Sequence, residues 1–197
     1  MDLILIRHGL PVTERRTDGS AADPGLSELG QRQARLLGAL LSAEPIDAIY
    51  SSPMRRALQT AQPLSKQLGL EVALDDDLKE YDAGSDTYVP AEELERGDPQ
   101  ELKAAVERLR AFDAGDFQKT VVAAIERIVA ANRGRTVAVT CHGGVINAWA
   151  GHVLGTQRVL FFQPDYTSIH RFRAATSGAR SLVSLNERVH LHNDGLL

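Results

Sequence analysis

Three predicted strands of this chain each end in a polar motif, and this pattern constrains the fold more than any other feature. The strands cover residues 3–6, 46–50 and 135–140, and the motifs that follow them are Arg7-His8-Gly9, Ser51-Ser52-Pro53 and Cys141-His142-Gly143-Gly144. The first strand is continuously apolar, which is typical of a strand buried on both faces of a parallel sheet. Ligands of open α/β sheets bind beyond the carboxyl ends of the strands, so the three motifs are candidates for one site.

Helical patterns separate the predicted strands. Ser27 is a predicted N-cap, and Leu29 belongs to the apolar stripe of the helix that follows it. Ser52 as N-cap and Pro53 as first helical residue predict a second helix, which Gly69 ends. The predicted helices cover residues 27–43, 52–68, 99–112, 116–132 and 145–153, and further strands cover 71–74, 167–173 and 181–185. This alternation predicts a three-layer α/β/α fold with a doubly wound, mostly parallel sheet.

The length and composition narrow the class of protein. A chain of 197 residues suggests a single domain over 1–197, in which the polar region 75–115 is an insertion or lid over the site. The formal charge of −4 argues against a nucleic-acid binder, and no apolar run reaches the roughly 20 residues of a membrane span. The start lacks the features of a signal peptide, and the single cysteine, Cys141, forms no intramolecular disulfide. We therefore expect a cytoplasmic protein.

The residue types in the motifs suit phosphate chemistry. Arg7 offers a planar fork for phosphate oxygens, and His8 beside it is a candidate nucleophile. Arg55 and Arg56 fall in the first turn of a predicted helix, where an anion would offset their conflict with the helix dipole. Taken alone, the first motif is more typical of a surface turn, and the two arginines are also compatible with a solvated helix face.

Two further candidates complete the set. His142 follows the strand at 135–140 and precedes two glycines, as His8 precedes Gly9. Glu80 is a carboxylic acid that could protonate a leaving alkoxide near a phosphate pocket. Cys141 is expected to be a buried, inert thiol.

Taken in order, these motifs resemble those of the histidine phosphatase superfamily, the phosphoglycerate-mutase-like group. The resemblance covers about residues 3–150 and rests on Leu5-Ile6-Arg7-His8-Gly9, Ser51-Ser52-Pro53, Arg56-Ala57, Gln59-Thr60-Ala61, Leu78-Lys79-Glu80 and His142-Gly143. It implies His8 as nucleophile, Glu80 as proton donor and His142 as second pocket histidine. It also implies that Arg7, Arg56, His142 and Gly143 bind the substrate phosphate, and that Arg56 rather than Arg55 is the second phosphate arginine. Asp77, Asp82 and Glu71 lie close enough in sequence to be alternatives to Glu80.

The chain departs from the family pattern after Gly9. Leu10-Pro11 stands where many members have a polar pair, and Glu14 stands where many have an asparagine that touches phosphate. Arg15, Arg16 or Thr17 could supply the missing contact, or nothing does. These departures leave the identity of the substrate open.

The predicted activity is hydrolysis of a small phosphorylated metabolite through a phosphohistidine, without a metal ion or other cofactor. A phosphoglycerate-type mutase is the alternative in the same class, and a catalytically weak module that binds a phospho-ligand or a partner protein is the alternative in another. The expected partner is a small phosphomonoester, with no nucleic acid and no membrane. The oligomeric state, a homodimer included, is left open.

The remaining histidines and aromatic residues have simpler interpretations. His190 and His192 have the spacing of two metal ligands on one strand face, but no acidic or cysteine partner accompanies them, so a solvated tail is expected. His152 and His170 are expected to be structural. Trp149 and Phe161-Phe162 are expected to be packing residues rather than a binding platform.

Overall fold

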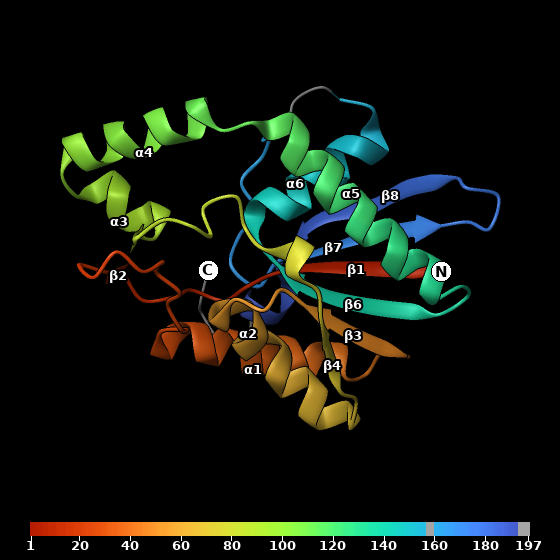
Figure 1. Cartoon of the computed structure of the whole chain (residues 1–197). Helices are drawn as coiled ribbons and strands as arrows, with labels where there is room; N and C mark the ends of the chain where they lie inside the picture. The colour runs from red at the N-terminus through yellow and green to blue at the C-terminus, as the bar shows by residue number, and fades with distance from the viewer. Residues whose placement is uncertain (157–159, 193–197) are drawn as a thin grey trace.

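A six-stranded mixed sheet forms the centre of the computed structural model, which describes residues 1–156 and 160–192 (Figure 1). The strand order is β4-β3-β6-β1-β7-β8. The first four of these strands pair in parallel, β7 pairs antiparallel with β1, and β8 pairs antiparallel with β7. The strands are β1 (Asp2–Arg7), β3 (Ala48–Ser51), β4 (Val72–Leu74), β6 (Thr136–Cys141), β7 (Ile169–Ala174) and β8 (Arg180–Glu187). The predicted α/β fold with a mostly parallel sheet is confirmed.

The strand β1 divides the core into two layers because its side chains alternate between the faces of the sheet. Ile4 and Ile6 face one layer, which includes residues of helices α1 (Glu28–Leu41) and α2 (Arg55–Leu68). Leu3 and Leu5 face the other layer, formed with α5 (Ala114–Ala131) and α6 (Gly143–Leu154).

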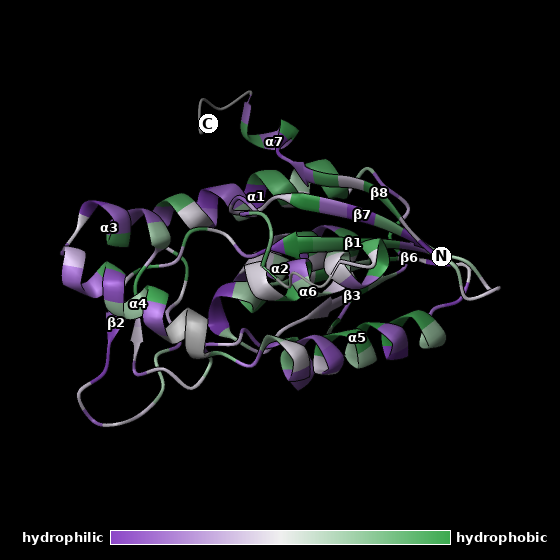
Figure 2. Ribbon diagram, turned by 90° about the horizontal axis from the view of Figure 1, so that it is seen from above, coloured by the Kyte–Doolittle hydropathy of each residue, from purple (hydrophilic) through white to green (hydrophobic). Residues whose placement is uncertain are grey.

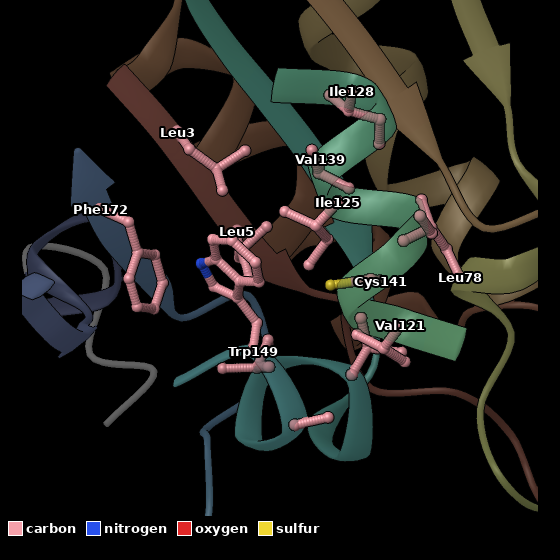
Figure 3. Packing of buried hydrophobic residues seen from close by; sticks show 14 of the residues in the cluster. Leu3, Leu5, Leu78, Val121, Ile125, Ile128, Val139, Cys141, Trp149 and Phe172 are labelled. Atoms are coloured by element: carbon pink, nitrogen blue, oxygen red, sulfur yellow. The ribbon is translucent and has the colours of Figure 1, made fainter. Parts of the chain in front are cut away.

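The second layer contains Trp149, which is fully buried and packs against Phe172, as Figure 3 shows. Trp149 is therefore the packing residue that was predicted. Figure 2 shows that hydrophobic residues concentrate along the central strands.

The segment between β4 and α5 contains more regular structure than its polar sequence predicts. The sequence did not predict the 3-10 helix η1 (Asp76–Leu78), strand β5 (Thr87–Tyr88) or helix α3 (Ala91–Arg96), whereas α4 (Pro99–Ala111) confirms the helix predicted over residues 99–112. β5 pairs with β2 (Glu14–Arg15), which lies in the region predicted to be a loop. Figure 1 shows α3 and α4 extending past the strand ends on the side opposite the N-terminus. Two-residue strands carry no periodicity, so the sequence did not reveal β2 and β5.

The structure confirms two of the predicted helix boundaries and contradicts a third. The Ser27 hydroxyl accepts a hydrogen bond from the Gly30 amide at 3.0 Å, and Gly69 ends α2 with φ of 65°. α2 begins at Arg55 with Met54 as N-cap, so the prediction that Ser52 caps this helix is wrong. The Ser52 hydroxyl instead lies 2.8 Å from His142 Nε2.

Leu29 was expected on the inner face of α1 but is 40% exposed, because the buried side of this helix is formed around Leu37 and Leu41.

The helices within the described ranges are all too short or too polar to cross a membrane. The short helix α7 (Val189–His192) ends the described part of the chain and packs against α1.

Candidate active site

Strand pairing brings the two motif histidines together. β1 and β6 are neighbours, and their register places Arg7 opposite Cys141. The residue that follows each strand is a histidine, and the ring centroids of His8 and His142 are 5.1 Å apart. Both rings are buried at the carboxyl edge of the sheet. The prediction that the polar motifs at the strand ends lie close together is confirmed.

The surroundings of His8 fix which ring nitrogen carries the proton. Nδ1 lies 2.8 Å from the Gly9 carbonyl oxygen. A carbonyl can only accept, so Nδ1 is the donor, and in the neutral ring Nε2 keeps its lone pair. Burial, with the charges of Arg56 and Arg7, holds the pKa of His8 well below its usual range. His8 is therefore neutral near pH 7, with Nε2 available as a nucleophile.

Gly9 is required by a close approach of two backbones. A Cβ atom at Gly9 would lie 2.7 Å from the carbonyl oxygen of Gly30 in α1. The Gly9 amide donates to Thr60 Oγ1 at 3.0 Å, and this hydroxyl donates to the Arg56 carbonyl at 2.7 Å. The glycine therefore lets the turn after His8 lie directly against α1 and α2.

Arg7 is held in place through one part of its guanidinium group. Its Nη1 donates to the Pro164 carbonyl at 2.6 Å, and its Cζ lies 3.9 Å from the centroid of the Tyr166 ring. Its Nε is buried and has no hydrogen-bond partner among the described residues. A buried cation with an unpaired donor is suited to bind an anion.

Arg56 shows the same feature more strongly. It is 1% exposed, and none of its three guanidinium nitrogens has a hydrogen-bond partner within the described ranges. Its Cζ lies 4.5 Å from the Tyr88 ring centroid, and Nη2 lies 3.7 Å from Asp82 Oδ1. Arg55, in contrast, is exposed and binds the Asp23 carbonyl. The structure therefore separates a buried Arg56 from a solvated Arg55.

His142 is held from one side. Its Nε2 lies 2.8 Å from the Ser52 hydroxyl, while its buried Nδ1 finds no partner in the described part of the chain. Burial and the charges of Arg56, His8 and Arg7 keep the pKa of His142 well below its usual range. The ring is neutral, and one nitrogen remains to bind a ligand.

Glu80 lies against the N-terminus of α6. Its Oε2 accepts from the Gly144 amide at 2.9 Å, and a Cβ atom at Gly144 would overlap the carboxyl group. Burial and the charge of Asp82 raise the pKa of Glu80 to about 7, against hydrogen bonds and the charge of Arg56 that lower it. A large fraction of this carboxyl group is therefore protonated near neutral pH, as a general acid requires.

The other acidic residues of this region lie differently. The carboxylates of Asp75 and Asp77 bind the Arg127 guanidinium, at 3.0 and 2.9 Å. Asp82 is in the pocket but faces the guanidinium of Arg56. Of these carboxyl groups, Glu80 is the one that accepts a hydrogen bond from the backbone of α6.

Most of the predicted site residues line one cavity of about 950 Å³, but the fully buried His142 is not among the described residues that line it. Arg7, His8, Arg56, Glu80 and Gly143 all contribute to its wall. Phe161 and Phe162 also line it, although they pack against the core as predicted. Sequence reasoning did not place Tyr88 in the site and named Asp82 only as an alternative to Glu80, because no local pattern distinguishes them from loop residues.

Neither the residues after Gly9 nor those considered as substitutes for the missing asparagine contact, Arg15, Arg16 and Thr17, are among the described residues that line the cavity. Among the described lining residues, neither Leu10 nor Pro11 is present. Glu14 and Arg16 pair with each other, and Arg15 pairs with Glu101 on α4. Arg15 therefore belongs to the contact between the β2 segment and the helical insertion, while Glu14 and Arg16 pair within the β2 segment.

The tail histidines have structural surroundings. His190 is buried, and its Nε2 lies 2.9 Å from Thr167 Oγ1, so the expectation of a solvated tail is wrong for this residue. His192 is exposed. His170 Nε2 lies 2.9 Å from Ser168 Oγ, which fits its expected structural role. Residues 1–156 and 160–192 contain no group of three histidine, cysteine or carboxylate side chains placed to hold a metal ion.

A mixed α/β sheet that gathers two neutral histidines and two buried arginines at one edge is typical of proteins that bind phosphate groups. The family model of the histidine phosphatase superfamily, branch 1, matches residues 3–188. This chain therefore belongs to the histidine phosphatase superfamily. The buried Cys141, whose thiol pKa is raised by burial, fits its expected inert character.

Relatives of known name agree with this assignment. Phosphoserine phosphatase 1 of Hydrogenobacter thermophilus is 31% identical over 183 residues, which cover 85% of each protein. A bifunctional protein of Mycobacterium tuberculosis is 34% identical over 149 residues, or 71% of this chain. The match covers 40% of that mycobacterial protein, which is therefore considerably longer than the shared region.

Solved structures share the fold over nearly the whole chain. A phosphoserine phosphatase of Entamoeba histolytica, in complex with 3-phosphoglyceric acid, has a TM-score of 0.74 and 27% identity, covering 96% of this chain and 98% of that one. A mycobacterial glucosyl-3-phosphoglycerate phosphatase has a TM-score of 0.75 at 21% identity, covering 95% and 99%. The second likeness concerns the fold alone.

Proposed function

We propose that this protein hydrolyses a small phosphomonoester through a phosphohistidine formed on His8. The observation that carries the proposal is the convergence of a neutral His8, two buried arginines with unpaired donors, and a carboxylic acid, Glu80, in one cavity. Nucleophile, anion-binding groups and proton donor are the three parts that such a reaction needs.

The substrate phosphate binds between Arg7, Arg56 and His142, with the backbone of Gly143 beside it. The guanidinium groups of the arginines and Nδ1 of His142 donate to the phosphoryl oxygens. The positive charge of the two guanidinium groups balances the negative charge that spreads over these oxygens in the transition state. The two arginines supply fixed charge, so the proposal includes no metal ion and no other cofactor.

The reaction proceeds in two displacements. First, Nε2 of His8 forms a bond to phosphorus while the bond to the leaving oxygen breaks, and the Glu80 carboxyl group gives its proton to that oxygen. Second, a water molecule attacks the phosphohistidine and loses a proton to the Glu80 carboxylate. Inorganic phosphate leaves, and both residues return to their first states.

The named relatives support a small metabolite as substrate. Two of them are phosphoserine phosphatases, and one of these is seen with 3-phosphoglyceric acid. We propose that the chain forms a single domain and that the region 75–115, which supplies Glu80, Asp82 and Tyr88 to the cavity, sets specificity within that class. A mutase would use the same nucleophile but return the phosphoryl group to an acceptor.

Rapid-quench labelling tests the proposal. Incubation with a radiolabelled phosphomonoester should put acid-labile, base-stable phosphate on His8, and His8→Ala should lose the label and several orders of magnitude of turnover. Label on Cys141 or on a serine would refute the assignment. Activity that requires a bisphosphorylated primer would indicate a mutase instead.

A further inference from the structure

The side of the cavity where a leaving group must lie is aromatic. Glu80 gives its proton to the leaving oxygen in the proposed function, so the alcohol part of the substrate departs past Glu80. The next residue, Tyr81, stacks on Phe112 with ring centroids 4.9 Å apart, and Phe112 contacts Phe117 at 5.3 Å. Tyr81 and Phe112 line the cavity, and Phe117 packs against the core, which anchors this wall.

A second apolar wall is fixed by a buried amide. Asn147, which is 1% exposed, accepts hydrogen bonds from the amides of Phe161 and Phe162 at 2.9 and 3.2 Å. Its Nδ2 donates to the carbonyl oxygens of Phe162 and Gly143, both at 2.9 Å. A buried side chain that satisfies four backbone groups holds the Phe161-Phe162 segment in one place beside the phosphate pocket.

Each charged side chain of the cavity already has a partner or a role in the proposed phosphate chemistry. Among the lining residues that the structure describes, the charged side chains are Arg7, Arg56, Glu80 and Asp82. In the proposed function Arg7 and Arg56 hold the phosphate, Glu80 moves a proton, and Asp82 faces Arg56 at 3.7 Å. A carboxylate or ammonium group on the alcohol would therefore lose water against apolar walls without gaining an ion pair.

We propose, on the basis of the phosphatase function above, that the alcohol part of the natural substrate is apolar and of aromatic size. It rests against the Tyr81–Phe112 wall and the Phe161-Phe162 wall while the phosphate lies on the arginines. The cavity of about 950 Å³ is far larger than a phosphate ion and accommodates such a group.

Three phosphate esters of primary alcohols separate this substrate class from a charged one, because their leaving groups are of the same kind. They are ethyl phosphate, phenethyl phosphate and O-phosphoserine. The value of kcat/KM for phenethyl phosphate should exceed those of the other two by about tenfold or more, as expected for partial burial of one phenyl ring.

Two variants of the cavity walls test whether these apolar side chains cause the preference for phenethyl phosphate. Phe112→Ala in the first wall and Phe161→Ala in the second wall should each lower the ratio of kcat/KM for phenethyl phosphate over ethyl phosphate severalfold. The matched control is Val183→Ala on β8, a residue 52% exposed and remote from the cavity, which should leave the ratio unchanged. Circular dichroism checks that each variant is folded.

The outcomes distinguish this inference from the proposed function. A preference for O-phosphoserine over phenethyl phosphate, or a ratio that neither wall variant changes, would overturn the apolar substrate while the phosphatase assignment stands. Hydrolysis of none of the three esters, with no phosphate on His8, would overturn the phosphatase assignment and this inference with it.

Discussion

Replacing Glu80 by glutamine should remove most of the activity on alkyl phosphates and yet stabilise the protein at alkaline pH. The folded chain raises the pKa of this carboxyl group from 4.5 to about 7, mainly through burial and the charge of Asp82. At 1.36 kcal/mol for each pKa unit, the ionised form costs the folded state up to about 3 kcal/mol. Glutamine has the same shape, can still accept from the Gly144 amide, and carries no charge.

The direction of the pH dependence follows from where the proton is bound. Below pH 4.5 both the folded and the unfolded chain hold the proton, so Glu80 contributes no pH dependence. Between 4.5 and about 7 the unfolded chain releases it first, so the free energy of unfolding falls as pH rises. Above about pH 7 the loss is complete. The stability gained by Glu80→Gln should therefore be absent in acid and reach at most about 3 kcal/mol at pH 8.

Urea denaturation at pH 4.5 and at pH 8 measures the effect in wild type and variant. Glu71→Gln, which changes an exposed carboxyl group near the end of α2, is the matched control and should show no such gain. A Glu80→Gln protein that is equally or less stable than wild type at pH 8 would refute the idea that the site stores an unfavourable buried charge.

Three further predictions concern activity. Glu80→Gln should slow ethyl phosphate hydrolysis by about a hundredfold or more, yet affect p-nitrophenyl phosphate much less. Asp77→Asn should show no such dependence on the leaving group, and Asp82→Asn should show none in acid, where Glu80 keeps its proton. Asp82→Asn removes a negative charge beside Glu80, so the alkaline limb of the kcat/KM profile for ethyl phosphate should move to lower pH; an unmoved limb would contradict the coupling. Dialysis against EDTA should leave turnover intact, and a loss restored by zinc, magnesium or manganese would refute metal independence.

The sequence predicted the parts of the site that follow directly from strand ends. His8 and His142 each come one residue after a strand, and parallel pairing of β1 with β6 is enough to bring them together. The choice between Arg55 and Arg56 came from a family resemblance. The structure gives its physical reason: successive residues of a helix point about 100° apart, so Arg56 faces the interior while Arg55 faces solvent.

Contacts between distant segments were beyond prediction. The hydrogen bond between Ser52 and His142 joins residues that are 90 positions apart in the sequence. The local sequence around Ser52 therefore indicates only a helix N-cap. The burial of His190 likewise depends on where Thr167 lies, 23 residues earlier. Phe161 and Phe162 are large apolar residues, so the sequence predicts only that they pack in the core. Their place in the cavity wall depends on hydrogen bonds from their backbone amides to Asn147, which is 14 and 15 residues away.

The pairing of β1 with β6 also has a consequence for how the protein reaches its folded state. The register joins Asp2 to Thr136, so neighbouring strands come from opposite parts of the chain. Closing so long a loop is entropically costly, and chains rich in such distant contacts fold slowly. During synthesis β1 therefore leaves the ribosome more than a hundred residues before β6, the strand with which it pairs in parallel. Return of catalytic turnover during refolding should thus trail the return of helical circular dichroism.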